Sequence, residues 1–443
     1  MGGRGHPTLS KRQDQVRLAG RETAGQSPEV GSFSNGLKLG YVTSRFPKLT
    51  ETFVLFEMLA VERQGVAIDL FPLLRERATT VHPEAAPLVE RARFLPFLSW
   101  SIIRSQVWFL RHRPRRYLRT IGEVVGGTWG SPNFLIGGLG ILPKVAHAAR
   151  LMRAAGVDHV HCHFANHPAL AGYIIHRLVG IPYSFTAHGS DLHVDRHMLC
   201  QKVAAADFVV AVSEDNRRVI LDSCPAADGR VRVVHCGVDT SVFRPVDDPS
   251  SRTTDQRPSL DILSIGTLHE VKGQSVLVEA GRLLAERGIS MRIRFVGDGP
   301  DRPMLEERIA AADLGPQVEL LGARTRAEIA ALLASTDVVV APSVPTREGK
   351  REGIPVVLME AMASGVPVVA SRLSGIPELV ADGQNGMLFP AGDATALADL
   401  LGELAADPGL RERLGQAGRA TVLREFDIDT NAARLVEAFR AAA

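Results

Sequence analysis

The chain has 443 residues, a formal net charge of +2 and a hydrophobic share of 45%. At roughly 150 residues per domain, this length predicts two or three domains with sizeable cores. The near-neutral charge balance excludes the chain-wide basic field that a nucleic-acid-binding protein carries. No apolar run reaches the roughly 18 residues that span a bilayer, and the polar N-terminus has no signal-peptide core. We therefore expect a cytoplasmic protein.

The cysteines are few and scattered. The chain has only Cys162, Cys200, Cys224 and Cys236, and no two of them form a Cys-x-x-Cys pair. In a chain of this length such spacing is typical of a reduced cytosolic protein and not of a disulfide scaffold.

The first half of the chain predicts alternating strands and helices. Residues 1–35, rich in Gly, Arg, Gln and Ser, are expected to form a disordered tail. Helices are predicted over 50–65, where Thr50 or Thr52 is a candidate cap, and over 167–179. Strands are predicted over 37–47, 66–74, 157–164, 182–191, 207–214 and 231–239. This order is how a layered α/β fold begins.

Residues 91–120 differ in character, because eight arginines are interleaved with Phe, Leu, Ile and Trp. One interpretation is a basic amphipathic helix that lies on an anionic membrane surface. The other is a helix whose apolar face packs on its own domain while the arginines face solvent. The sequence leaves both open.

A polar segment rich in proline, residues 245–258, predicts a linker, and a second alternating series follows it. Strands are expected over 261–268, 291–300, 318–323, 337–343 and 367–371, with a helix over 273–288. We predict two doubly wound, Rossmann-like α/β domains, residues 36–244 and 259–425, that face one another across a central cleft. Residues 426–443 are expected to form a last helix that returns to the first domain. Ligands of such folds bind beyond the carboxyl ends of the strands.

Two glutamates flank the start of a helix predicted over 355–364. Glu352 precedes it, Gly353 allows close backbone approach, Pro355 suits the first turn, and Glu360 lies inside. A helix N-terminus at a sheet edge favours phosphate, and carboxylates accept hydrogen bonds from sugar hydroxyls. The pattern indicates a sugar nucleotide. The alternative is one glutamate that complements the helix dipole and another on a solvated face.

Two other patterns resemble metal sites. His159, His161 and His163 alternate along a strand, with Cys162 and His167 nearby, as in some zinc sites. Cys162 points away from the histidines, and no carboxylate or second cysteine completes a set. Asp427–Asp429 is an Asp-x-Asp sequence, but it precedes a helix and is better explained as a cap. We expect no metal and no cofactor.

The segment "EGIPVVLMEAMASGVPVV" resembles the E-x7-E signature of family 4 glycosyltransferases, which are retaining enzymes of the GT-B fold. "GTLHEVKGQSVLVEA", "FVGDGPDRPMLEERI" and "SGIPELVADGQNGMLFPAGD" resemble further segments of that family in the same order. "RFPKLTETFVLFEM" and "FTAHGSDL" resemble a subgroup that makes exopolysaccharides of the colanic-acid type. The resemblance covers about residues 37 to 441.

The resemblance implies a role for each site residue. Glu360 bonds the ribose hydroxyls, Lys272 pairs with the diphosphate, and Glu352 faces the transferred sugar beside Gly353 and Ile354. Pro355 and Thr267 complete the donor side. His188 lies close to the sugar as the second catalytic residue. The acceptor side holds Arg45, Thr50 and Asp191, of which Asp191 supports the His188 loop.

One position departs from the family pattern. Thr267 stands where the family has an arginine, five residues before Lys272, and Arg45 and Arg347 are candidate substitutes for that charge. The expected function is transfer of a sugar from a UDP- or GDP-sugar, with retention and without metal, to a glycan or lipid-linked acceptor. The alternatives are a non-catalytic sugar-nucleotide-binding subunit and a UDP-sugar epimerase of the same fold.

Overall fold

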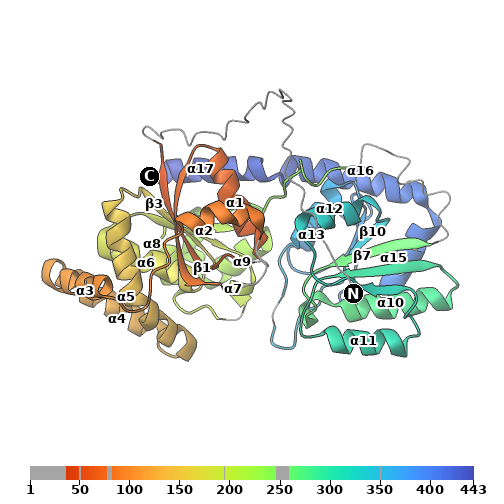
Figure 1. The fold of residues 1–443 in the computed structure, drawn as a ribbon, viewed down its shortest axis with the longest axis horizontal. Coiled ribbons are helices and arrows are strands. Elements are labelled where there is room, and N and C mark those ends of the chain that lie inside the picture. The colour runs from red at the N-terminus through yellow and green to blue at the C-terminus, as the bar shows by residue number, and fades with distance from the viewer. Residues whose placement is uncertain (1–35, 49–50, 77–81, 194, 246–258, 350) are drawn as a thin grey trace, which may run out of the picture. The chain divides into compact units, whose positions relative to one another are not determined.

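A computed structural model describes residues 36–48, 51–76, 82–193, 195–245, 259–349 and 351–443. The predicted tail and, apart from Pro245, the predicted linker lie outside the described residues. Two parallel six-stranded sheets form the framework (Figure 1). The α/β prediction with two doubly wound sheets is confirmed.

The first sheet has the order β2-β1-β3-β4-β5-β6 and the second the order β12-β11-β10-β7-β8-β9. The strands of the first are β1 (Lys38–Phe46), β2 (Ala67–Arg75), β3 (His159–His163), β4 (Tyr183–Ala187), β5 (Phe208–Ala211) and β6 (Val231–Val233). Those of the second are β7 (Leu260–Ile265), β8 (Met291–Val296), β9 (Val318–Leu320), β10 (Val338–Ala341), β11 (Val368–Ser371) and β12 (Met387–Phe389). Chain order reverses between β1 and β3 and between β7 and β10. Ligands of doubly wound sheets bind at such switch points.

The helices of the first half surround its sheet. They are α1 (Thr52–Arg63), α2 (Ala86–Arg91), α3 (Trp100–His112), α4 (Pro114–Thr128), α5 (Pro132–Ala154), α6 (His167–Val179), α7 (Ser190–His193), α8 (Leu199–Ala205) and α9 (Glu214–Ser223). The helices that follow are α10 (Gln274–Glu286), α11 (Arg302–Ala311), α12 (Arg326–Ala334), α13 (Val356–Ala363), α14 (Ile376–Leu379), α15 (Ala394–Ala406), α16 (Pro408–Glu425) and α17 (Ile428–Ala442).

The last helix, α17, packs on the first sheet and not on the second. It lies beside α1 (Figure 1), where Arg63 of α1 and Asp429 of α17 form an ion pair at 2.6 Å. Its apolar residues join one core cluster with β1 and α1, in which Phe439 and Leu435 are buried beside Leu39. The final helix therefore completes the hydrophobic core of the first sheet.

The arginine-rich segment 91–120 is not one helix. It divides into α3 and α4 at Arg113, because Pro114 restricts the residue before it and lacks the amide that would continue α3. One face of α3, with Ile102 and Phe109, is buried and packs on α5. The opposite face exposes large apolar side chains, including Trp100 at 79% and Val107 at 57%. The packing interpretation therefore accounts for one face of α3, and the membrane interpretation stays a prediction.

The expectation of reduced cysteines was wrong, whereas the count of uninterrupted apolar residues holds but misses one apolar helix. Within the described residues, α5 is long and apolar enough to cross a membrane by length and composition, although half of its most apolar window is buried in the protein. Counting uninterrupted apolar residues overlooked α5, because Pro143 and Lys144 divide it. In addition, Cys200 and Cys224 form a disulfide that links the start of α8 to the end of α9. Their separation of 24 residues gave no indication of pairing.

Candidate active site

Lys272 and Glu352 meet at the switch point of the second sheet. Lys272 follows β7 and Glu352 follows β10, and the two side chains form an ion pair. The hydroxyl of Ser343 donates a hydrogen bond of 2.5 Å to the other carboxylate oxygen of Glu352. The two charged side chains remain 24% and 15% exposed. An anionic ligand would therefore compete with Glu352 for the ammonium group of Lys272.

Two glycines beside Lys272 allow the backbone to pack closely against neighbouring segments of the chain. Gly273 has φ +63°, and a Cβ there would lie 1.9 Å from the carbonyl oxygen of Pro342. Gly266 packs against Lys272 less tightly, since a Cβ there would lie 3.3 Å from the lysine side chain. α10 begins directly after Gly273, so its uncapped first turn follows Lys272 by two residues in the chain. The turn thus combines a lysine with a helix N-terminus.

Thr267 brings no charge to this turn. Its side chain is exposed, and its carbonyl oxygen accepts a hydrogen bond of 3.0 Å from Gln274. Arg45 and Arg347, the proposed substitutes, are both exposed. Among the contacts of the described residues, neither guanidinium reaches Lys272. The second cation of the family pattern has no counterpart among these contacts.

Helix α13 carries Glu360 about a turn from its start. Pro355 is the N-cap, one position earlier than predicted, and the helix begins at Val356. Glu360 is half-buried, and burial raises the pKa of its carboxyl to about 7, although the charge of Arg326 opposes the rise. A carboxyl with this pKa is partly protonated near neutral pH.

Arg326 is a site residue that the sequence did not indicate. It is the first residue of α12, its guanidinium lies 4.1 Å from the ring centre of Phe56, and it pairs with Asp239 at 3.3 Å. Its charge acts on Glu360. No sequence pattern distinguishes it, because an arginine after a capping threonine is common on exposed helices.

His188 lies directly after β4, on a loop that Asp191 holds in place. The carboxylate of Asp191 accepts hydrogen bonds from the amides of His188 at 3.0 Å and Ala165 at 2.5 Å. Burial, reinforced by the charge of His163, keeps the pKa of His188 well below its ordinary value. A Cβ on Gly353 would lie 3.3 Å from the carbonyl oxygen of His188. The loop after β4 thus approaches the Gly-Ile-Pro turn before α13.

The alternate histidines of β3 are buried inside the first sheet. His161 uses both ring nitrogens, with Ser184 at 2.8 Å and Thr186 at 2.9 Å. The expectation that no carboxylate lies nearby was wrong, because Glu57 of α1 comes close enough to form a potential metal-ligand group with His161 and His163. A metal there would bind one ring nitrogen of His161 and displace the hydroxyl that this nitrogen now contacts. Hydrogen bonding within the core explains this histidine better.

The Asp-x-Asp sequence behaves as predicted. Asp427 is the N-cap of α17, and its carboxylate accepts a hydrogen bond of 3.0 Å from the amide of Thr430. Asp429 is engaged by Arg63. Capping and surface pairing account for both carboxylates.

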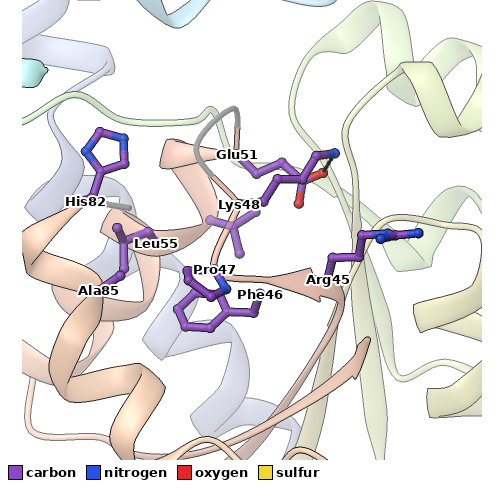
Figure 2. A pocket seen from close by; sticks show the side chains of 9 residues that line it. Arg45, Phe46, Pro47, Lys48, Glu51, Leu55, His82 and Ala85 are labelled. Carbon is purple, nitrogen blue, oxygen red and sulfur yellow. Dashed lines mark hydrogen bonds and ion pairs between the residues drawn. The ribbon is translucent and has the colours of Figure 1, made fainter. Parts of the chain in front are cut away.

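Two of the acceptor-side residues are described: Arg45 lies near the carboxyl end of β1, and Asp191 follows β4. Arg45 helps to line a small pocket with Phe46, Pro47, Lys48 and His82 (Figure 2). Figure 2 shows the guanidinium of Arg45 pointing away from the rings of Phe46 and Pro47. Thr50 lies outside the described residues. The pocket is lined both by charged residues, among them Arg45 and Lys48, and by apolar residues such as Leu55.

Family models match both halves of the chain. Residues 251–421 match "Glycosyl transferases group 1", and residues 103–242 match "Glycosyltransferase Family 4". A putative colanic acid biosynthesis glycosyltransferase (WcaL) of Escherichia coli is 32% identical over 382 residues, which cover 82% of this chain and 90% of the relative. An amylovoran biosynthesis glycosyltransferase (AmsK) of Erwinia amylovora is 34% identical over 65% of this chain and 70% of the relative.

Solved structures share the fold. HepE of Anabaena, crystallised in complex with UDP, has a TM-score of 0.69 at 18% identity over 91% of this chain and 100% of that chain. A glycosyltransferase of Rickettsia africae has a TM-score of 0.67 at 17% identity over 92% and 99% of the two chains. At these identities the likeness shows the arrangement of the two sheets.

Proposed function

This chain belongs to glycosyltransferase family 4, and on that premise we propose that it is a retaining, metal-independent hexosyltransferase using a UDP- or GDP-sugar. The acceptor is a glycan or lipid-linked saccharide of an exopolysaccharide or other cell-surface polysaccharide. The observation that carries the proposal is the Lys272–Glu352 pair at the switch point of the second sheet. The relatives that build colanic acid and amylovoran support the polysaccharide class, and the UDP bound by HepE favours UDP-sugars as the first donors to test.

The chemistry follows from where charge develops. As the sugar leaves, positive charge grows on its anomeric carbon and negative charge on the β-phosphate oxygen. Lys272 and the first amides of α10 would stabilise the phosphate, and its arrival would release Glu352 to accept sugar hydroxyls. Glu360 would hold the ribose. In a retaining reaction the acceptor attacks from the face that the phosphate leaves, and the phosphate takes the acceptor proton. In this proposal the positive charge that stabilises the leaving phosphate comes from Lys272 and not from a metal ion.

A donor screen tests this proposal directly. Thermal unfolding with a panel of UDP- and GDP-sugars should identify one donor that stabilises the protein. That donor, with acceptor extracts, should then release its nucleoside diphosphate in the presence of EDTA. Proton NMR of the first product should show the anomeric configuration of the donor. Failure of every sugar nucleotide to release nucleoside diphosphate would reject the proposal, and loss of activity in EDTA would reject metal independence.

Thr267 favours one second candidate, a non-catalytic sugar-nucleotide-binding subunit, because the phosphate site has one cation fewer than the family pattern. This candidate predicts tight donor binding without turnover, which the same assay detects. Replacing Thr267 by Arg should raise turnover if the missing charge limits catalysis. The epimerase alternative would form product without any acceptor.

We also propose that the protein works on the cytoplasmic face of the membrane, docked through α3, α4 and the start of α5. This surface exposes Leu98 at 76%, Trp100 at 79%, Trp129 at 74% and Ile136 at 72%. In Figure 1, α3 and α4 lie at the outer edge of the first half of the chain. Exposed arginines accompany the apolar residues: Arg104, Arg111, Arg115, Arg116 and Arg119. Apolar and cationic groups together match an anionic lipid surface.

Vesicle flotation tests the docking surface. The variant with Arg111, Arg115 and Arg116 changed to Ala should float less with anionic phosphatidylglycerol vesicles. Arg113 is left in place, because its guanidinium donates a hydrogen bond of 3.1 Å to the carbonyl oxygen of Leu178. Trp100→Ala should weaken binding further, and neutral phosphatidylcholine vesicles serve as the control. Unchanged flotation of both variants would reject this surface.

A further inference from the structure

We infer that Glu57 and His163 are positioning residues that set which ring nitrogen of His188 carries the proton. The inference rests on the proposed function, in which His188 lies beside the transferred sugar. Three side chains from three elements form a line: Glu57 of α1, His163 at the end of β3 and His188 after β4. Glu57 lies within the segment "RFPKLTETFVLFEM", but no role was assigned to it there, and only the fold brings it to His163.

The distances define the line. Nε2 of His163 lies 3.2 Å from Oε1 of Glu57, and Nδ1 of His163 lies 3.1 Å from Nε2 of His188. The side chain of His163 has 0% exposure and that of Glu57 has 20%. Tyr41 also points its hydroxyl at Oε1 of Glu57, at 3.4 Å. The imidazole between the carboxylate and His188 is therefore sealed from solvent.

The carboxylate of Glu57 determines which ring nitrogen of His163 donates and which accepts. An imidazole with one ring proton donates from one nitrogen and accepts at the other. The Nε2 of His163 forms no aligned hydrogen bond with a described residue, and the carboxylate of Glu57 lies 3.2 Å from it. A lone pair pointed at a carboxylate would be repelled, so Nε2 carries the proton and Nδ1 is left as an acceptor.

The consequence passes to His188. Since Nδ1 of His163 accepts, Nε2 of His188 must donate, and its remaining nitrogen, Nδ1, carries no proton. No described group forms a hydrogen bond with Nδ1, and the residue is partly open to solvent. His188 then offers a bare acceptor, which suits a sugar hydroxyl that donates. Phe53 and Phe164 hold the ring in place, each with its centroid 4.7 Å away.

The neighbouring His161 shows what happens when both ring nitrogens pair with hydroxyl groups. Its two nitrogens meet the hydroxyls of Ser184 and Thr186, and a hydroxyl rotates to donate or accept as required. Its partners therefore impose no tautomer on it. Glu57 differs because a carboxylate can only accept. The direction of the line depends on this one side chain.

Nitrogen NMR tests the inference without any need for activity. With ring-15N-labelled histidine at pH 8, the His188 signals, assigned by their loss in His188→Asn, should show a protonated Nε2 and a bare Nδ1. The amide of Glu57→Gln can donate as well as accept, so it no longer fixes the tautomer of His163. The form of His188 with its proton on Nδ1 should then become populated. Glu57→Asp keeps an acceptor-only carboxylate and should restore the original signature. Glu62→Gln, on the same helix but paired with Arg91, is the control.

Activity gives a second readout. Glu57→Gln should lower kcat by roughly 10- to 100-fold, the usual effect of losing a partner that orients an imidazole. The donor KM should change less than about twofold, because Glu57 does not touch the donor side. A wild-type His188 with its proton on Nδ1, or a Glu57→Gln signature identical to wild type, overturns the inference and leaves the proposed function standing. Absence of nucleoside diphosphate release in wild type rejects the proposed function, and the NMR result still decides the role of Glu57.

Discussion

Changing Glu360 to Gln should make the unliganded protein more stable at pH 8. Burial raises the pKa of this carboxyl from 4.5 to about 7, so the fold favours its neutral form. Below about pH 4.5 the group is protonated in both folded and unfolded chains, and its burial carries no ionisation penalty. The penalty grows between pH 4.5 and 7 and is constant above, so wild-type stability falls as pH rises through this window.

The size of the effect follows from the same pKa. A rise from 4.5 to about 7 corresponds to about 3 kcal/mol at pH 8. Glu360 is half-buried, so solvent screening reduces the expected gain to about 1–3 kcal/mol. Glutamine has the same shape and stays neutral, so it removes the penalty without a cavity. At pH 5 the gain should fall below about 1 kcal/mol.

Urea unfolding at the two pH values measures the difference. Glu437→Gln, at an exposed position of α17, is the matched control and should change stability by less than about 0.5 kcal/mol. The reasoning fails if Glu360→Gln is no more stable than wild type at pH 8. It fails equally if the gain is the same at pH 5. A confirmed gain would mean that this carboxylate is kept at the expense of stability.

Three further predictions concern the donor side. UDP affinity, measured by calorimetry, should rise with pH through about 7 and then level off, because the ribose hydroxyls donate to the ionised carboxyl of Glu360. In Glu360→Gln this rise should vanish. Lys272→Ala should lower kcat by about 100-fold or more in a nucleoside diphosphate release assay, and a loss below tenfold would exclude Lys272 from stabilising the leaving phosphate. Gly273→Ala and Gly288→Ala both place a Cβ on a backbone with positive φ, but only at Gly273 does it meet a carbonyl, that of Pro342. The Gly288 variant should lose about 1–2 kcal/mol of unfolding free energy and keep its donor affinity. The Gly273 variant should lose more stability and also donor affinity. Equal losses in the two variants would show that the close approach of Gly273 to Pro342 does not matter.

The sequence was informative about the candidate site where local patterns combine with the rule that doubly wound sheets bind ligands at their switch point. Lys272 and Glu352 are 80 residues apart, yet each follows a strand that the patterns predicted. The switch-point rule for doubly wound sheets then places both at one edge. The Gly-Ile-Pro turn was equally legible, because Pro355 and Gly353 restrict the backbone in known ways.

The missed features depend on packing between distant segments. Glu57 lies in an ordinary helix position, and its place beside His163 arises only when α1 packs on the sheet. Arg326 and the disulfide of Cys200 and Cys224 are of the same kind. The three-residue strand β12 was too short to show a period. Local patterns report backbone preferences, and these features are set by which surfaces meet.

The return of α17 to the first sheet has a consequence for biosynthesis. Phe439 packs its ring against Tyr41, His161 and Phe208, with centroid distances of 6.4, 5.0 and 5.7 Å. A ribosome makes those three partners roughly 20 to 40 s before it reaches α17, at about 10 residues per second. During that interval the first half has an open apolar surface that its own later residues will cover. The core around Tyr41 and Phe208 is therefore completed only after the second sheet has been synthesised.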